Sequence, residues 1–362
     1  MNKLRVKVVA ALQRWGTTLR KLSPQLLAPA VLLPSDWSAG VYKEPALRRS
    51  FGRRAHRTLH YRLYLPHDRP RDGQLPLLVM LHGCSQDAAQ FAAGTRMNAA
   101  AQERGCAVLY PEQGTGANPM RCWNWFDREA QQGRGEAGLI TGLVHDVMRL
   151  GVIDASRVYV AGMSAGAAMA EILALRNPGL FAASALHSGV PYAAAGSASE
   201  AMRVMHSGAG ASTLQSARQA LEGVANAAVL GPALVIHGSA DTRVNPGNAE
   251  QIVALRLALA GVPPTGEQGD VPTDDREYEV GGRKIRERDY AIGSKLVVRS
   301  LIVEGLGHAW SGGDAQLPFN DAAGPDASSL LLEFLLGYRL APAARPPALR
   351  WSFQPDVRQH LQ

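Results

Sequence analysis

A serine between glycines is the strongest chemical motif in the chain, in the stretch Gly162-Met163-Ser164-Ala165-Gly166. The motif follows the apolar stretch RVYVA and precedes the helix-like stretch AAMAEILALR, a strand–turn–helix context typical of a nucleophilic serine. The glycines permit a turn sharp enough to lift the hydroxyl off a sheet edge. A plain glycine-rich turn is the alternative, since the chain holds 37 glycines. The context favours Ser164 as a nucleophile.

A serine hydroxyl needs a base to accept its proton and an acid to orient that base. Chains that use this turn carry the three groups in the order serine, acid, histidine. His308 lies in the loop GLGHAW after the last apolar stretch, and Asp241 ends the stretch VIHGSAD. A surface-loop histidine and a turn aspartate are the alternatives. Order and position favour His308 as the base and Asp241 as the acid.

A tetrahedral intermediate also needs donors for its oxyanion. We expect one donor to be the backbone N–H of Ala165, directly after the nucleophile. The loop after LPLLVMLHG should supply the second, through the backbone N–H of Cys84. We hypothesise that Cys84 forms a disulfide with Cys122, which would hold the loop of Cys122 beside the oxyanion donor.

The aromatic cluster MRCWNWF allows two interpretations. Trp123 either belongs to a packed loop or forms a wall of an apolar acyl pocket. Trp310, two residues beyond the proposed base, is the better candidate to contact substrate. His82 is expected to brace the oxyanion loop, and His187 and His237 are expected to be core residues.

Metal and cofactor motifs are missing from the sequence. The three cysteines form no CxxC pair, and no HExxH occurs. We therefore expect no metal and no cofactor.

Apolar stretches alternate with helix-like stretches from about residue 57 onward. This pattern predicts an α/β fold with a mostly parallel central sheet and helices on both faces. Functional residues of such sheets gather at the carboxyl ends of the strands, where Ser164, Asp241 and His308 are expected.

Three segments are predicted. Residues 1–50 form a basic arm, amphipathic or disordered, and residues 51–340 form the catalytic domain. Within that domain, residues 263–295 are a polar insertion whose second half resembles a hairpin around Gly281-Gly282, at the edge of the sheet. Residues 341–362 form a tail rich in Pro and Arg.

The charge is unevenly distributed. Residues 1–62 carry 13 Lys/Arg against two acidic residues, and the remainder carries 25 against 29. A nucleic-acid-binding protein would place its positive charge on a structured face, so we expect no nucleic-acid partner. The basic arm suggests weak contact with a membrane surface, and its charges interrupt the apolar core that a secretion signal needs.

The chain resembles the polyhydroxybutyrate (PHB) depolymerase family of esterases, which is related to feruloyl and acetylxylan esterases. The matching stretches include LHGCSQDAAQFAAGTRMNAAA, NPMRCWNWF, RVYVAGMSAGAAMA, VIHGSADTRVNPGNAEQI and GLGHAWSGG. The resemblance implies an α/β-hydrolase fold and cleavage of short-chain hydroxyacyl or related esters, polymeric or small. It assigns the triad to Ser164, Asp241 and His308, and the oxyanion positions to Cys84 and Ala165.

Several alternatives stay open. The same triad serves feruloyl and acetylxylan esterases, peptidases and acyltransferases, and a binding protein on a hydrolase scaffold is a further alternative. The family resemblance suggests secretion, and a cytoplasmic location is the alternative. The sequence does not give the oligomeric state.

Overall fold

The computed structural model describes residues 37–45, 57–68, 74–210, 215, 217, 230–262 and 271–341. All of them belong to the compact unit Asp36–Gln362. The predicted tail beyond Ala341 and most of the predicted basic arm lie outside the described residues. None of the described helices is long and apolar enough to cross a membrane.

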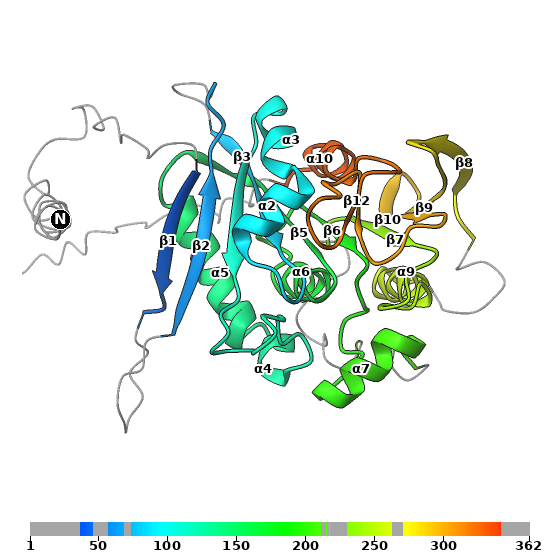
Figure 1. The fold of residues 1–362 in the computed structure, drawn as a ribbon, viewed down its shortest axis with the longest axis horizontal. Coiled ribbons are helices and arrows are strands. Elements are labelled where there is room, and N and C mark those ends of the chain that lie inside the picture. Colours follow the sequence, from blue (N-terminus) through cyan, green and yellow to red (C-terminus); the bar gives the residue numbers. More distant parts are fainter. Residues whose placement is uncertain are drawn as a thin grey trace, which may run out of the picture. The chain divides into compact units, whose positions relative to one another are not determined.

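A ten-stranded sheet forms the centre of this unit, in the order β1-β2-β4-β3-β5-β6-β7-β10-β9-β8 (Figure 1). Its strands are β1 (Trp37–Lys43), β2 (Thr58–Tyr64), β3 (Leu75–Leu81), β4 (Ala107–Glu112), β5 (Ile153–Met163), β6 (Ala183–His187), β7 (Ala233–Gly238), β8 (Asp274–Val280), β9 (Arg283–Ile292) and β10 (Lys295–Val303). The six strands from β4 to β10 in this order are parallel, and two antiparallel strands flank them on each side. The predicted mostly parallel sheet is thus confirmed at its centre.

Helices cover both faces, because the central strands are apolar on both sides. The helices are α2 (Ala88–Thr95), α3 (Met97–Glu103), α4 (Arg128–Gln131), α5 (Gly135–Met148), α6 (Ala165–Arg176), α7 (Ala198–Ser207), α9 (Gly247–Leu259) and α10 (Ala327–Leu336). Figure 1 shows α2, α3 and α10 on one face and α5, α6 and α9 on the other. The short strands β11 (Trp310–Ser311) and β12 (Asn320–Asp321) pair with each other after β10.

The first strand lies where the sequence predicted the basic arm. β1 pairs antiparallel with β2 at one edge of the sheet, and its Trp37 ring packs edge-on against Tyr110 of β4 at 5.5 Å. The predicted domain start at residue 51 is therefore too late, because Trp37–Lys43 is already part of the sheet.

The polar insertion forms the opposite edge. β8 and β9 are a hairpin whose register closes at Val280 and Arg283, around Gly281-Gly282 as predicted. β9 also pairs with β10 and buries Ile285 and Tyr290. The second half of the polar insertion is thus part of the sheet itself.

Candidate active site

Ser164 occupies a sharp turn between β5 and α6. Its φ is 57°, a conformation that is costly for a residue with a side chain and that occurs at functional turns. A Cβ on Gly162 would lie 2.5 Å from the backbone of Gly166, and one on Gly166 would lie 2.0 Å from the Leu81 carbonyl oxygen. Only glycines at these two positions let the turn form against β3.

Asp241 and His308 form a hydrogen-bonded pair from two neighbouring parallel strands. Asp241 follows β7, His308 follows β10, and His308 Nδ1 lies 2.7 Å from Asp241 Oδ2. Since a carboxylate only accepts, Nδ1 carries the proton. The imidazole Nε2 is then left as the proton acceptor.

The Asp241 carboxylate is held from several sides. Its Oδ1 accepts the backbone N–H groups of Arg243 and Val244, both at 2.9 Å. His237 Nε2 lies 2.9 Å from the Val244 carbonyl oxygen and 3.4 Å from Asp241 Oδ2. Burial alone would raise the pKa of Asp241, but hydrogen bonds from His237, His308 and Val244 hold it well below its usual range. The acid stays ionised beside the imidazole.

A cavity of about 300 Å³ brings Ser164 and His308 together. Most of its surface is apolar, and four methionines contribute, two of them from α7. Its lining residues are Gly83, Cys84, Ser85, Gln86, Met120, Cys122, Met163, Ser164, Met202, Met205, His206, Thr242, Arg243, Val244, His308 and Phe319. Sequence reasoning missed the contributions of α7 and Phe319, because no motif marks them.

The two expected oxyanion positions flank the serine. Ala165 is the first residue of α6, where a helix leaves its backbone N–H groups without intrahelical acceptors. Cys84 lies in the loop after β3 and lines the same cavity as Ser164. This loop passes close to the nucleophile, since a Cβ on Gly83 would lie 3.5 Å from Ser164 Cβ.

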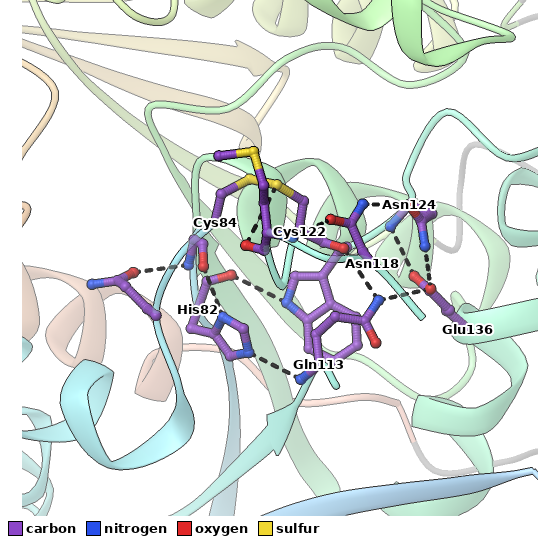
Figure 2. Close-up of a disulfide and its surroundings, with 11 residues drawn as sticks. His82, Cys84, Gln113, Asn118, Cys122, Asn124 and Glu136 are labelled. Carbon is purple, nitrogen blue, oxygen red and sulfur yellow. Dashed lines mark hydrogen bonds between the residues drawn. A yellow bond between two sulfur atoms is a disulfide. The ribbon is translucent and has the colours of Figure 1, made fainter. Parts of the chain in front are cut away.

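Cys84 and Cys122 form a disulfide, as hypothesised from the sequence (Figure 2). The bridge joins the loop after β3 to the loop after β4, and Ser85 N–H donates across to the Met120 carbonyl at 2.7 Å. Cys106, the third cysteine, is a buried free thiol.

Glu136 on α5 holds the loop after β4 in place through hydrogen bonds. Its carboxylate accepts hydrogen bonds from Gln113 Nε2 at 2.7 Å, from Asn124 Nδ2 at 2.6 Å and from the Asn124 backbone N–H at 2.8 Å. Figure 2 shows these bonds continuing through Gln113 to His82. Gln113 N–H donates to His82 Nε2 at 3.0 Å, so the carboxylate is connected to the loop that carries Cys84. In the sequence Glu136 has no distinguishing signal.

His82 supports this loop, as expected. Its Nε2 accepts from the backbone, and its Nδ1 lies 2.8 Å from the Gly83 carbonyl oxygen. Burial lowers its pKa to about 4. His187 is likewise buried, and burial lowers its pKa to about 3. Both side chains are neutral core residues at ordinary pH.

The two tryptophans proposed for the substrate pocket do not line the cavity. Trp123 is fully buried and donates its indole N–H to the His82 carbonyl at 3.1 Å. Trp310 is fully buried, stacks on His187 at 4.9 Å and donates to Ser328 Oγ at 3.1 Å. The pocket prediction is wrong for both, because their polar edges find acceptors in the core and their rings pack behind the site.

No group of three or more His, Cys, Asp or Glu side chains that could hold a metal ion occurs in the described part of the chain.

Comparison with known proteins connects this geometry to a family. The family model described as "Esterase PHB depolymerase" matches residues 59–273. The chain is 34% identical to poly(3-hydroxyalkanoate) depolymerase C of Paucimonas lemoignei, over 64% of this chain and 54% of that protein. It is 28% identical to feruloyl esterase B of Thermothelomyces thermophilus, over 68% of this chain and 82% of that protein. The match thus spans about half the length of the depolymerase.

Solved structures show the same fold. An acetyl xylan esterase from Aspergillus awamori superposes with a TM-score of 0.56 at 20% identity, covering 69% of this chain and 89% of that one.

Proposed function

The chain belongs to the PHB depolymerase family of esterases, and from that premise we propose that it is a serine carboxylic ester hydrolase with Ser164 as its nucleophile. One observation carries the proposal. Ser164, on a strained turn, lines the same cavity as His308. The Nδ1 atom of His308 is hydrogen-bonded to the buried carboxylate of Asp241. That constellation serves nucleophilic acyl transfer in unrelated folds.

In the first half-reaction, Ser164 Oγ attacks the ester carbonyl carbon while His308 Nε2 takes its proton. The carbonyl π electrons move to the oxygen, which the N–H groups of Cys84 and Ala165 stabilise. Collapse of the intermediate breaks the ester C–O bond, and the proton passes from His308 to the leaving alcohol. Asp241 keeps the imidazole in the required tautomer and balances its transient charge.

In the second half-reaction, water attacks the acyl-enzyme and gives its proton to His308. The same oxyanion donors stabilise the second tetrahedral intermediate. Its collapse releases the carboxylic acid and returns the proton to Ser164 Oγ. No step requires a metal or cofactor.

Esters with short acyl chains, including hydroxyacyl esters, suit the cavity best. The volume of about 300 Å³ is small, and its methionines offer flexible apolar contacts. The name of one relative, poly(3-hydroxyalkanoate) depolymerase C, supports the hydroxyacyl part of this range, whereas that of another, feruloyl esterase B, points to feruloyl esters as the alternative. We propose hydroxyalkanoate esters, polymeric or oligomeric, as the first substrates to test.

The disulfide supports a proposal about the compartment in which the protein acts. Disulfides persist in oxidising surroundings and are rare in a reducing cytoplasm. The bridge between Cys84 and Cys122 supports a proposed site of action outside the cytoplasm.

The test is hydrolysis of 4-nitrophenyl esters from acetate to octanoate by the wild type and by Ser164→Ala. We expect a decrease in kcat of about 10⁴-fold or more, because the nucleophile is lost. Ser199→Ala, an exposed serine on α7, is the matched control and should retain activity. Undiminished turnover by Ser164→Ala would refute the assignment.

A further inference from the structure

The described side chains that line the active-site cavity include a positive charge and no negative charge. None of the described lining residues is an aspartate or glutamate, and Arg243 is the one permanently charged side chain among them. The acid of the proposed triad, Asp241, lies buried behind His308. A bound substrate therefore meets a largely apolar wall whose one permanent charge is a guanidinium.

The backbone of Arg243 is fixed beside the proposed triad, while its side chain is exposed and packs on a neighbouring ring. The backbone N–H of Arg243 donates to Asp241 Oδ1 at 2.9 Å, which ties its position to the proposed triad. Its guanidinium carbon lies 5.4 Å from the centre of the Phe319 ring. The Phe319 ring in turn stands edge-on to the His308 imidazole at 6.5 Å. Phe319 thus connects the guanidinium to the proposed base.

The Phe319 platform is itself held in place. Its φ of 64° is unusual for a bulky residue, and its carbonyl accepts the Trp310 N–H at 2.8 Å next to the β11–β12 pair. A conformation of this kind persists only where its surroundings enforce it.

The guanidinium has unused binding capacity. It stacks on the Phe319 ring, and within the described residues no carboxylate forms an ion pair with it. Thirteen other arginine side chains in the described part of the chain lie within 4 Å of an acidic side chain, as Arg157 does with Asp154 and Arg299 with Asp289. Arginine presents a planar set of donors that matches a carboxylate in a bidentate geometry.

We propose that Arg243, supported by Phe319, binds a carboxylate of the substrate, and that the preferred esters carry a free carboxylate a few bonds from the scissile carbonyl. Linear oligomers of hydroxyacids carry such a group at one end. The inference rests on the proposed ester hydrolysis at Ser164 and names the substrate class that this site favours.

The test uses two pairs of substrates in which a carboxylate is exchanged for the isosteric neutral amide. In the first pair, 3-(butyryloxy)butanoate and 3-(butyryloxy)butanamide, the group lies on the alcohol side. In the second pair, ethyl hydrogen glutarate and ethyl glutaramate, it lies on the acyl side. The readout is the ratio of kcat/KM within each pair, measured by chromatography of the released acid.

We expect the wild type to favour the carboxylate in at least one pair by about fivefold or more, the size expected for a partly exposed charge pair. Arg243→Gln should bring that ratio close to one, Arg243→Lys should retain part of it, and added salt should reduce it in the wild type. Arg149→Gln, an exposed arginine at the end of α5, is the matched control and should leave the ratio unchanged.

Two results would overturn the inference alone. These are Ser164-dependent hydrolysis with no preference in either pair, and a preference that survives in Arg243→Gln. Absence of turnover on all four esters and on the 4-nitrophenyl panel would instead contradict the proposed hydrolase function, and the inference with it.

Discussion

Removing the disulfide should destabilise the fold by an amount that its loop length sets. The bridge joins cysteines 38 positions apart. A cross-link over a loop of that length removes chain entropy from the unfolded state worth about 4 kcal/mol. We therefore expect Cys84→Ala/Cys122→Ala to lower the free energy of unfolding by about this amount.

Urea unfolding is the assay, run on the wild type and on the double variant, each with and without reductant. The reduced wild type should approach the double variant. The double variant itself should not respond to reductant, which makes it the internal control. A difference below about 1 kcal/mol between oxidised wild type and double variant would contradict the entropic argument.

Activity adds a second, independent readout. Cys84 supplies a proposed oxyanion donor through its backbone, so a looser loop should lower kcat more than it changes KM. The loss should stay below the roughly hundredfold typical of a missing donor, because the Ser85–Met120 hydrogen bond and the Arg121–Asp87 ion pair still join the two loops. An unchanged kcat in a destabilised variant would show that the bridge does not position this donor.

Three further changes probe other parts of the molecule. Gly166→Ala should abolish labelling of the nucleophile by a fluorophosphonate, because its Cβ would lie 2.0 Å from a backbone carbonyl; a labelled, folded variant would contradict this. Arg256→Met should cost about 3–5 kcal/mol in urea unfolding because it leaves the buried Glu171 carboxylate unpaired, and Arg256→Met/Glu171→Met should recover most of that loss. The free energy of unfolding should fall as pH drops from 6.5 toward 4, by up to about 1.4 kcal/mol per pH unit for each of two histidines. Burial lowers the pKa of His82 to about 4 and of His187 to about 3, so the unfolded chain takes up protons at a higher pH than the folded protein does. A His187→Gln variant in which the free energy of unfolding depends on pH as steeply as in the wild type would refute this.

The sequence was sufficient to predict the site's strand-end residues. Parallel strands bring their carboxyl ends to one edge, so residues after β5, β7 and β10 are neighbours whatever their separation along the chain. The pairing of His308 with Asp241 agrees with that reasoning. The nucleophilic role of Ser164 stays a prediction until the variant is measured.

Side-chain direction within loops could not be predicted in the same way. Trp123 and Trp310 lie near the site in sequence, yet both rings face the core, since the direction depends on acceptors supplied by other segments. Met202 and Arg243 line the cavity from α7 and from the loop after Asp241, without a local pattern that marks them. β1 was missed because a short edge strand is defined by its partner rather than by its own composition.

The order of the strands also has a consequence for the growing chain during translation. β5 pairs with β3, and β6 and β7 extend the sheet, so the serine turn can assemble before the ribosome has made β10. The proposed base follows β10, 144 residues after Ser164. Domains tend to acquire structure from the N-terminal side as synthesis proceeds. A nascent or prematurely terminated chain would thus carry an assembled turn without its proton acceptor, and chemical competence would arrive only with the last core strand.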